Sequence, residues 1–598
     1  MPRHALCIVA SSLLLGAAAL VSGCSDTTPG GAGDAGTGDV LAQDSAVSDS
    51  LAGDSATPAD TGALPTDTVV TGDTGVPADT TLPSDTVVPS DTQQGGCTPG
   101  ERVCDSPAAY RTCLADGSDY GPPGDCESDE ECRAGECKVR CPNDPKFGSY
   151  VGCEFWSTDL PNYPDPTLNP TPENLPWAIV VSNPGAFSVR VAFEMPPLFT
   201  YQPPDDTVPT GESRVFLLPN INVQGTSLRP KGVHVTATGP ILVHQFNPWD
   251  NTFSNDASLL LPDPLLGTDY VIMSLQSGAT EIEVIPGFSF PNQNGYFTVI
   301  AAFDNTDVTF QVTGPVRPSG SIPQLAAGDI HTLRLNRGDV LSIQSDPETL
   351  GQAADLTGSR VTATKPVAVF GGHEEAVIGE GQPDSEGHVE SPCCADHLED
   401  QMLPLGILST RYLAVHSPPR GTTVIEPDYW RIQAAEPGVV ITTSPPQAGA
   451  NNVTLPQIGS WVEVRTNQSF EVTATGKIQV GQYLVSRDAT EAVTGDASLV
   501  LMVPTDRFRK DYIISMPANY NRRYLAVVKP NAASVTVDGV PVTQPFTPLG
   551  ATGYGYAYVQ TTEGVHVISG DEKFGLTVYG YSNAVSFSYI GGLAGPGE

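Results

Sequence analysis

Basic residues are scarce in this chain. Its 598 residues include 29 Lys and Arg against 68 Asp and Glu, and the formal net charge is -39. A face that binds nucleic acid needs an excess of Lys and Arg to neutralise phosphates. Electrostatic docking on anionic lipid needs the same excess. The composition therefore argues against nucleic acid as a partner and against a charge-driven contact with a membrane surface.

Sequence motifs that carry catalysis are also missing. The chain contains no HExxH metalloprotease motif, no GxSxG nucleophile elbow and no CxxC pair. We therefore expect no enzymatic activity and no cofactor. Paired carboxylates for glycoside hydrolysis stay open as an alternative, because two such residues need not be near each other in the chain.

Helical periodicity is the third absence. No long stretch places apolar residues at helical spacing, whereas Gly (60) and Pro (55) are abundant. From about residue 147, short segments rich in β-branched and aromatic residues follow one another, for example 296–303, 307–314 and 330–335. Turn residues bound these segments, as is typical of strands. The sequence therefore predicts an all-β body.

The first 23 residues have the features of an export signal. Arg3 precedes an apolar stretch that ends in VSGC and is too short for a membrane span. The ending resembles the lipobox of bacterial lipoproteins. We therefore expect 1–23 to be a lipoprotein signal peptide and Cys24 to carry the lipid, whose acyl chains form a membrane anchor. Ser25 favours the outer membrane of a bacterial cell envelope, with the protein exposed at the cell surface.

A low-complexity segment follows over residues 24–96. Positions 25–96 hold twelve Asp and no Lys, Arg or aromatic residue. Such a composition cannot bury enough apolar surface to offset chain entropy, and its like charges repel one another. We expect a disordered Asp/Thr/Pro/Gly-rich stalk.

Cysteines then concentrate in a module over residues 97–141. In an exported protein this density predicts disulfides, and zinc would call for CxxC pairs. Outside the signal peptide and the lipidation site, the disulfide candidates are Cys97, Cys104, Cys113, Cys126, Cys132, Cys137, Cys141, Cys153, Cys393 and Cys394.

The pairing of these cysteines is partly open. The six from Cys97 to Cys137 can close three bridges, which leaves Cys141 and Cys153 for each other or for the adjacent pair Cys393 and Cys394. A bridge between adjacent cysteines is strained. The favoured hypothesis therefore joins Cys153 to Cys393 or Cys394.

One phrase recurs along the body. VTATGPILVHQF at 235–246 returns as VTATKPVAVF at 361–370 and VTATGKIQV at 472–480. A decayed fourth copy starts near Val567. Apolar and polar residues alternate on both sides of a Gly-Pro pair or its equivalent, which predicts a β-hairpin. The phrase is therefore interpreted as scaffold.

A second phrase recurs with the first. NDASLLLPDPLLGTDYVIMS at 255–274 matches GDASLVLMVPTDRFRKDYIISMP at 495–517, and 397–417 is a looser copy. We expect its Asp256 and Asp496 to be turn or cap residues. The strand that opens each unit is expected to start at a tyrosine, namely Tyr270, Tyr412 or Tyr512.

The two phrases together indicate internal duplication. We expect residues 142–595 to form about four repeated β-rich units that resemble sandwiches. A β-propeller is the alternative. It is disfavoured because repeat lengths that differ by thirty residues fit badly into a closed ring.

Four segments of the body also occur in a known family. They are YVGCEFWSTDLPN (150–162), PWAIVVSNP (176–184), ILVHQFNPWDNTFSNDASLLLP (241–262) and CCADHLEDQMLP (393–404). With these segments, about 145–593 resembles the N-terminal domain of the IgGFc-binding protein family. The resemblance implies an extracellular binding or adhesive role. It does not imply antibody binding, and the family supplies no set of binding residues.

Segment 371–401 holds the best candidate for a reaction centre. His373, His388 and His397 lie there among the acids Glu374, Glu375, Asp384, Glu386, Glu390, Asp396 and Glu399. Imidazole and carboxylate together suit zinc or another divalent ion. Because no ligand spacing repeats on one element, the favoured interpretation is a solvated acidic loop tied down by cysteines, with no metal.

The combined expectation is a cell-surface lipoprotein that touches the membrane through its lipid. Its β-rich body is expected to bind an extracellular glycan, a matrix polymer or a partner protein through loops. One alternative is a secreted metal-dependent hydrolase with its site in 371–401. Another is a purely structural envelope protein.

Overall fold

A computed structural model describes residues 97–598 with short gaps. The gaps are 107, 128–129, 140, 142–147, 167, 196–198, 202, 204, 250–253, 278–281, 286–287, 291–292, 348–353 and 381–393. The expected signal peptide, the lipidation site Cys24, the stalk, His388 and Cys393 lie outside the described residues.

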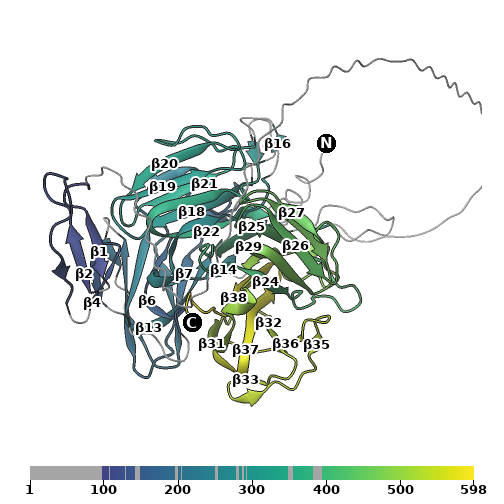
Figure 1. Cartoon of the computed structure of the whole chain (residues 1–598). Coiled ribbons are helices and arrows are strands. Elements are labelled where there is room, and N and C mark those ends of the chain that lie inside the picture. Colours follow the sequence, from purple (N-terminus) through teal and green to yellow (C-terminus); the bar gives the residue numbers. More distant parts are fainter. Residues whose placement is uncertain are drawn as a thin grey trace, which may run out of the picture. The chain divides into compact units, whose positions relative to one another are not determined.

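The described chain is built of strands, which confirms the all-β prediction (Figure 1). Its helical elements are single 3-10 turns: η1 (Pro172–Asn174), η2 (Asp263–Leu265), η3 (Arg487–Ala489) and η4 (Thr505–Arg507). Within the described residues, no helix has the length and apolar character needed to cross a membrane.

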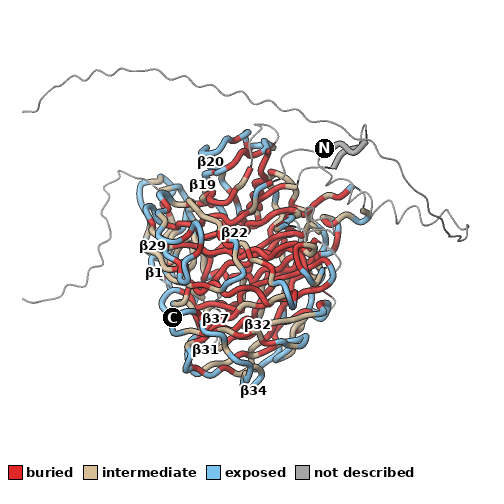
Figure 2. The backbone as a smooth tube through the Cα atoms, turned by 90° about the vertical axis from the view of Figure 1, so that its right-hand side faces the viewer, coloured by how far each residue is buried: buried red, intermediate tan, exposed pale blue. Residues whose placement is uncertain are grey.

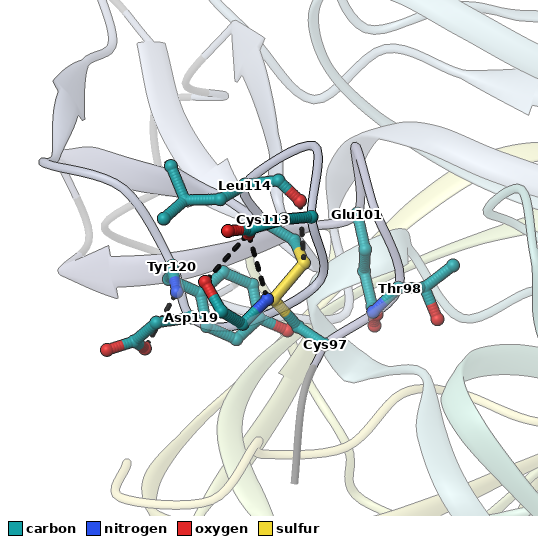
Figure 3. Close-up of a disulfide and its surroundings, with 9 residues drawn as sticks. Cys97, Thr98, Glu101, Cys113, Leu114, Asp119 and Tyr120 are labelled. Atoms are coloured by element: carbon teal, nitrogen blue, oxygen red, sulfur yellow. Dashed lines mark hydrogen bonds between the residues drawn. A yellow bond between two sulfur atoms is a disulfide. The ribbon is translucent and has the colours of Figure 1, made fainter.

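The cysteine-rich module contains two small sheets and several disulfides. Strands β1 (Arg102–Ser106), β2 (Ala109–Thr112) and β3 (Gly124–Asp125) form one sheet, and β4 (Glu130–Arg133) pairs with β5 (Glu136–Val139). The bridges are Cys97–Cys113, Cys104–Cys132, Cys126–Cys137 and Cys141–Cys153. Figure 3 shows the first of them, beside the hydrogen bond from the Leu114 N–H to the Asp119 carbonyl.

The hypothesis of a long-range bridge from Cys153 is wrong. Cys153 lies in β6 (Gly152–Ser157) and is bonded to Cys141, only 12 positions earlier in the chain. Closing so short a loop costs less entropy than joining distant segments. Cys394 is itself disulfide-bonded. Its partner is not one of the eight cysteines from Cys97 to Cys153, because these are all paired with one another.

Four larger sheets follow. The first contains β6 (Gly152–Ser157), β7 (Trp177–Ser182), β8 (Val189–Met195), β9 (Phe199–Tyr201), β10 (Thr207–Val208), β11 (Ser213–Leu218), β13 (Val233–Asn247) and β14 (Asp256–Leu259). The second contains β12 (Ser227–Arg229), β15 (Gly267–Val271), β18 (Gly295–Ala301), β19 (Thr306–Gln311), β20 (Ile330–Leu335), β21 (Val340–Gln344), β22 (Arg360–Ala376) and β23 (Asp396–Gln401). A separate hairpin is formed by β16 (Ile282–Ile285) and β17 (Phe288–Phe290).

The remaining two sheets complete the body. The third contains β24 (Ser409–Ala414), β25 (Asp428–Ala434), β26 (Val439–Ser444), β27 (Val453–Leu455), β28 (Trp461–Thr466), β29 (Phe470–Leu484) and β30 (Ser498–Leu501). The fourth contains β31 (Arg509–Met516), β32 (Arg522–Pro530), β33 (Val535–Val537), β34 (Val540–Pro541), β35 (Thr547–Pro548), β36 (Tyr554–Gln560), β37 (Gly564–Ser582) and β38 (Val585–Ile590). The prediction of four repeated β-rich units is confirmed.

Each sheet is organised around one long strand. The long strands are β13, β22, β29 and β37, and each contains one copy of the first repeated phrase. In the third sheet the first half of β29 pairs with β24 and β26, and its second half pairs with β25 and β30. The other three sheets follow the same plan. One strand therefore belongs to both halves of a curled sheet.

The change of partner takes place at a bend in the long strand. From Thr362 to Val367 the strand β22 advances five positions, while β15 advances only two, from Asp269 to Gly267. The same five-against-two step occurs in β13, β29 and β37. Extra residues on one strand of an antiparallel pair bend it, as in a β-bulge. The prediction of a hairpin at each phrase is therefore wrong, because the chain bends there without reversing.

Tyrosines fix this bend in three of the sheets. The Tyr412 hydroxyl donates to the Ile478 carbonyl at 2.6 Å and accepts the Ser409 N–H at 3.3 Å. Tyr270 and Tyr512 make the same two contacts in the second and fourth sheets. The first sheet has Phe155 at this register position, opposite Val235. By the same register Ile568, rather than Val567, corresponds to Val235 in the fourth sheet.

The last strand of each sheet lies at the middle of the body. These closing strands are β14, β23, β30 and β38. Both β14 and β30 contact β23 and β38, so the four strands contact one another in a ring. Figure 2 shows that buried residues fill the interior of the body and that exposed ones lie at its periphery. Repeats of unequal length therefore meet through their closing strands.

Candidate functional site

The ring of closing strands is held together by buried carboxyl groups. Each closing strand pairs with its long strand along one edge, which leaves backbone N–H groups unpaired along the other. A buried N–H needs a hydrogen-bond acceptor, and an unpaired strand edge needs protection. Side chains from neighbouring sheets supply the acceptors.

Asp256 joins three of the sheets. Its carboxyl group accepts the Leu499 N–H at 2.9 Å, the Ser498 hydroxyl at 2.8 Å and the Glu399 N–H at 3.3 Å. In the same way Asp400 accepts the Leu501 N–H at 2.7 Å. Asp256 is therefore the first residue of β14 and bonds neighbouring strands, so its expected role as a turn or cap residue is wrong, although it also accepts the Ala257 N–H at 3.0 Å.

Asp396 and Asp496 complete this polar interface. Asp396 accepts the N–H groups of Asn255 at 2.6 Å and Ser586 at 3.3 Å. Asp496 accepts the N–H of the next residue, Ala497, at 2.9 Å, and its own N–H donates to the Ser586 hydroxyl at 2.8 Å. These carboxyl groups hydrogen-bond to protein groups within the interface.

Burial changes the acidity of these groups. Desolvation raises the pKa of Asp256, Asp396 and Asp400 well above the usual carboxyl range. It also raises the pKa of Glu399 to about 8 and that of Asp496 to about 7. The ring therefore retains protons that exposed carboxyl groups lose near pH 4.

Segment 371–401 belongs largely to this interface. His373 lies in β22 and His397 in β23, and both side chains are buried. The His397 Nε2 atom is 3.4 Å from the Tyr296 hydroxyl and 3.5 Å from Glu399 Oε2. Burial lowers the pKa of His373 to about 4 and that of His397 to about 3. The interpretation of the whole segment as a solvated loop is therefore wrong for its two strands.

The described part of this segment does not form a metal site. Among described residues, two groups of three side chains bring their ligand atoms within 4.8 Å of one another, and neither includes His373 or His397. One group contains Cys126 and Cys137, which are bonded to each other. The other is Glu154, His234 and Asp263.

Arginines surround the second group. The Arg133 guanidinium lies 3.2 Å from Glu154 and 3.9 Å from Asp263. Arg337 donates to His234 Nδ1 at 2.7 Å, so the proton of a neutral imidazole lies on Nε2, which is 3.2 Å from Glu154. Two guanidinium groups thus supply the positive charge that a metal ion would bring. The group is an ionic junction between the module and the first two sheets.

A groove between the second and third sheets has a different character. Its volume is about 510 Å³, and loops of the two sheets line it. Gly358 and Gly459 meet there with φ values of +95° and +82°, and a Cβ on Gly358 would lie 2.4 Å from the Gly459 carbonyl oxygen. Only glycine allows this approach of the two backbones.

One guanidinium organises the groove. Arg431 of β25 lies 4.2 Å from the centre of the Trp461 ring and donates to Asp355 at 2.9 Å. Trp461 is half-buried and the Asp355 side chain is 18% exposed. An aromatic ring and a carboxylate from different sheets are thus held at one opening.

Sequence reasoning did not find this groove. Its residues come from three segments, near 313, 355–358 and 457–461. No spacing motif connects them, and the loops meet only because the two sheets pack together. The glycines at 358 and 459, each followed by serine, are the one local signal that the sequence offers.

Comparison with known proteins identifies one family. A family model described as IgGFc binding protein matches residues 256–580. The IgGFc-binding protein of Homo sapiens is 24% identical to the chain over 389 residues, which are 64% of this chain. The chain spans only 6% of the length of that relative. No solved structure matches the chain.

Proposed function

Because the chain belongs to the IgGFc-binding protein family, we propose that it is an extracellular binding protein held at a bacterial cell surface by a lipid on Cys24. Residues 24–96 serve as a stalk, and 97–141 form a stapled module. The repeated sheets of 142–595 form the binding body, which takes an extracellular glycan, matrix polymer or protein.

The strongest support is the way in which the body uses its polar groups. In the candidate catalytic segment, Asp396, Glu399 and Asp400 accept hydrogen bonds from neighbouring strands and side chains. Carboxyl groups used in this way hold a scaffold together. A rigid scaffold that presents loops is typical of binding proteins, and the description of the family names a binding activity.

The anchor is tested by labelling in a bacterial host. The full chain is expressed in cells fed an alkyne-tagged fatty acid, and the tag is detected on the purified protein. We expect label on the natural chain and none on Cys24→Ser. Equal labelling of both proteins, or of neither, would contradict the anchor.

The binding role is tested with the full chain in detergent micelles. Its probes are a glycan array, extracellular matrix polymers and immunoglobulin G Fc, the last because of the human relative's name. We expect saturable binding to at least one of these probes. Failure to bind any of them would favour a structural envelope role and overturn the proposal.

A further inference from the structure

The groove between the second and third sheets has the chemistry of a small-molecule site. Its volume of about 510 Å³ lies within the usual range of roughly 300–1,000 Å³ for ligand pockets. It opens where loops of two sheets meet, which is a common place for such sites. The lining combines one aromatic ring with hydroxyl, amide and carboxylate groups.

Trp461 supplies an apolar platform. Arg431 is only 4% exposed at its side chain, and it lies over the ring of Trp461. A cation over the face of an indole ring is attracted by the ring's quadrupole. The contact fixes the orientation of the ring at the mouth of the groove.

Asp355 supplies hydrogen-bond acceptors beside this platform. One carboxylate oxygen accepts the Thr357 N–H at 2.8 Å and the other accepts from Arg431 at 2.9 Å. Each oxygen has a second lone pair for a ligand hydroxyl. Because both oxygens are held from within the protein, the carboxylate needs no reorganisation when a ligand binds.

Gln457 and Ser460 contribute on the opposite side. Gln457 is exposed, and its side-chain amide makes no hydrogen bond within the described residues. The Ser460 hydroxyl accepts the Gln457 N–H at 3.2 Å, so its own proton can be donated to a ligand. An amide can donate and accept at once, which suits a ligand with several hydroxyl groups.

The charge of the groove favours a neutral ligand. Arg431 is paired with both Asp355 and Glu463, the latter at 3.4 Å, so its positive charge is already matched. An anionic ligand would meet two carboxylates. A metal ion would find one carboxylate from Asp355, which is already bonded to a guanidinium.

We propose that this groove is a saccharide-binding site that takes one neutral pyranose unit of an extracellular glycan. A pyranose ring presents a face of C–H groups surrounded by hydroxyl groups. That face packs on Trp461, while the hydroxyl groups bond to Asp355, Gln457 and Ser460. The inference rests on the proposed binding function and names its ligand class.

The test uses the full chain in detergent on an array of neutral and acidic glycans. The strongest neutral ligand is then titrated against variants. We expect Trp461→Ala to weaken binding about tenfold or more and Gln457→Ala about fivefold. Matched controls are Tyr429→Ala, an aromatic residue stacked with Arg465 at 4.6 Å, and Gln468→Ala, an exposed glutamine of the same sheet. Both controls should stay within about twofold of the natural chain.

The outcomes separate this inference from the broader function. Glycan binding that survives both groove variants would overturn the groove and leave the binding role intact. If the chain bound Fc or a matrix protein but no glycan, the groove proposal would likewise be overturned and the binding role would stand. If thermal unfolding of the Trp461→Ala variant shifts, Gln457→Ala decides the question, because the exposed Gln457 side chain makes no hydrogen bond within the described residues.

Discussion

At the scale of single residues, tyrosine hydroxyl groups bridge the bend of the long strand in three of the four sheets. Tyr270, Tyr412 and Tyr512 each bond a carbonyl of the long strand and an N–H of their own strand. The tyrosines lie in the opening strands as predicted, but each strand begins three residues before its tyrosine and not at it. The sequence could not show their bonds, because the partner carbonyl lies 62 to 97 positions later in the chain.

Removing one of these hydroxyl groups should destabilise the body. Tyr412→Phe leaves a buried carbonyl and an N–H without their partner, which we expect to cost about 1–3 kcal/mol of unfolding free energy. Chemical denaturation of the full chain measures the loss. The control is Tyr524→Phe, because the Tyr524 hydroxyl makes no hydrogen bond within the described part of the chain. Equal stability of the two variants would show that the bend does not depend on the tyrosine.

At the scale of elements, alternation identified the strands but not their continuity. The VTAT phrases lie in strands as predicted, yet the Gly-Pro pair was interpreted as a reversal. A tight turn and a strand bend have the same local composition. What distinguishes them is the partner strand, and in the second sheet that partner, β15, precedes the phrase by about ninety positions. Local patterns carry no information about such a partner.

The contact between two loops at the groove can be tested directly. Gly358→Ala introduces both a left-handed alanine and a clash with the Gly459 carbonyl. The left-handed conformation alone costs about 1–2 kcal/mol. Gly438→Ala is the matched control, because Gly438 has φ +70° with nothing within 4 Å of an added Cβ. We expect Gly358→Ala to lower the denaturation midpoint clearly more than Gly438→Ala, and equal losses would contradict a tight contact.

At the scale of the whole molecule, the acids that suggested a metal site stabilise the assembly of sheets. The sequence identified a segment with unusual chemistry, and Glu399 and Asp396 do have strongly shifted pKa values. It could not show that their partners are Ser258 and Ser586 of other sheets. Contacts between different repeats produce no regular spacing of residues in the sequence. The structural role of these acids could therefore be recognised only from their contacts in the folded protein.

The stability of the body should fall as pH rises from 6.5 to 8. Burial raises the pKa of Glu374 and Glu399 to about 8 and that of Asp159 to about 7. The folded chain releases the Asp159 proton only near pH 7 and those of the two glutamates near pH 8, while the unfolded chain has released all three above about pH 4. Each such group lowers stability by about 1.4 kcal/mol per pH unit until it ionises. Burial lowers the pKa of His244, His373 and His397, so these three side chains oppose the change only until the unfolded chain has lost its imidazolium protons, within about one pH unit above 6.5.

Denaturation midpoints at pH 6.5 and pH 8 measure this loss. Glu399→Gln should make the fall of stability with pH less steep, because the variant lacks one of the buried carboxyl groups that cause it. Glu212→Gln, at an exposed position, should leave the slope unchanged. A flat profile in the natural chain would mean that the buried carboxyl groups are ionised in the folded state.

The bridge between Cys141 and Cys153 has a mechanical consequence. Tension on the chain before Cys97 passes through a covalent frame and enters β6 near its first residue. Because β6 is paired antiparallel with β13, this load acts along the strands, and sliding them apart must break several hydrogen bonds at once. Force applied along β6 would therefore load this strand pair in shear, the direction in which paired strands resist separation best.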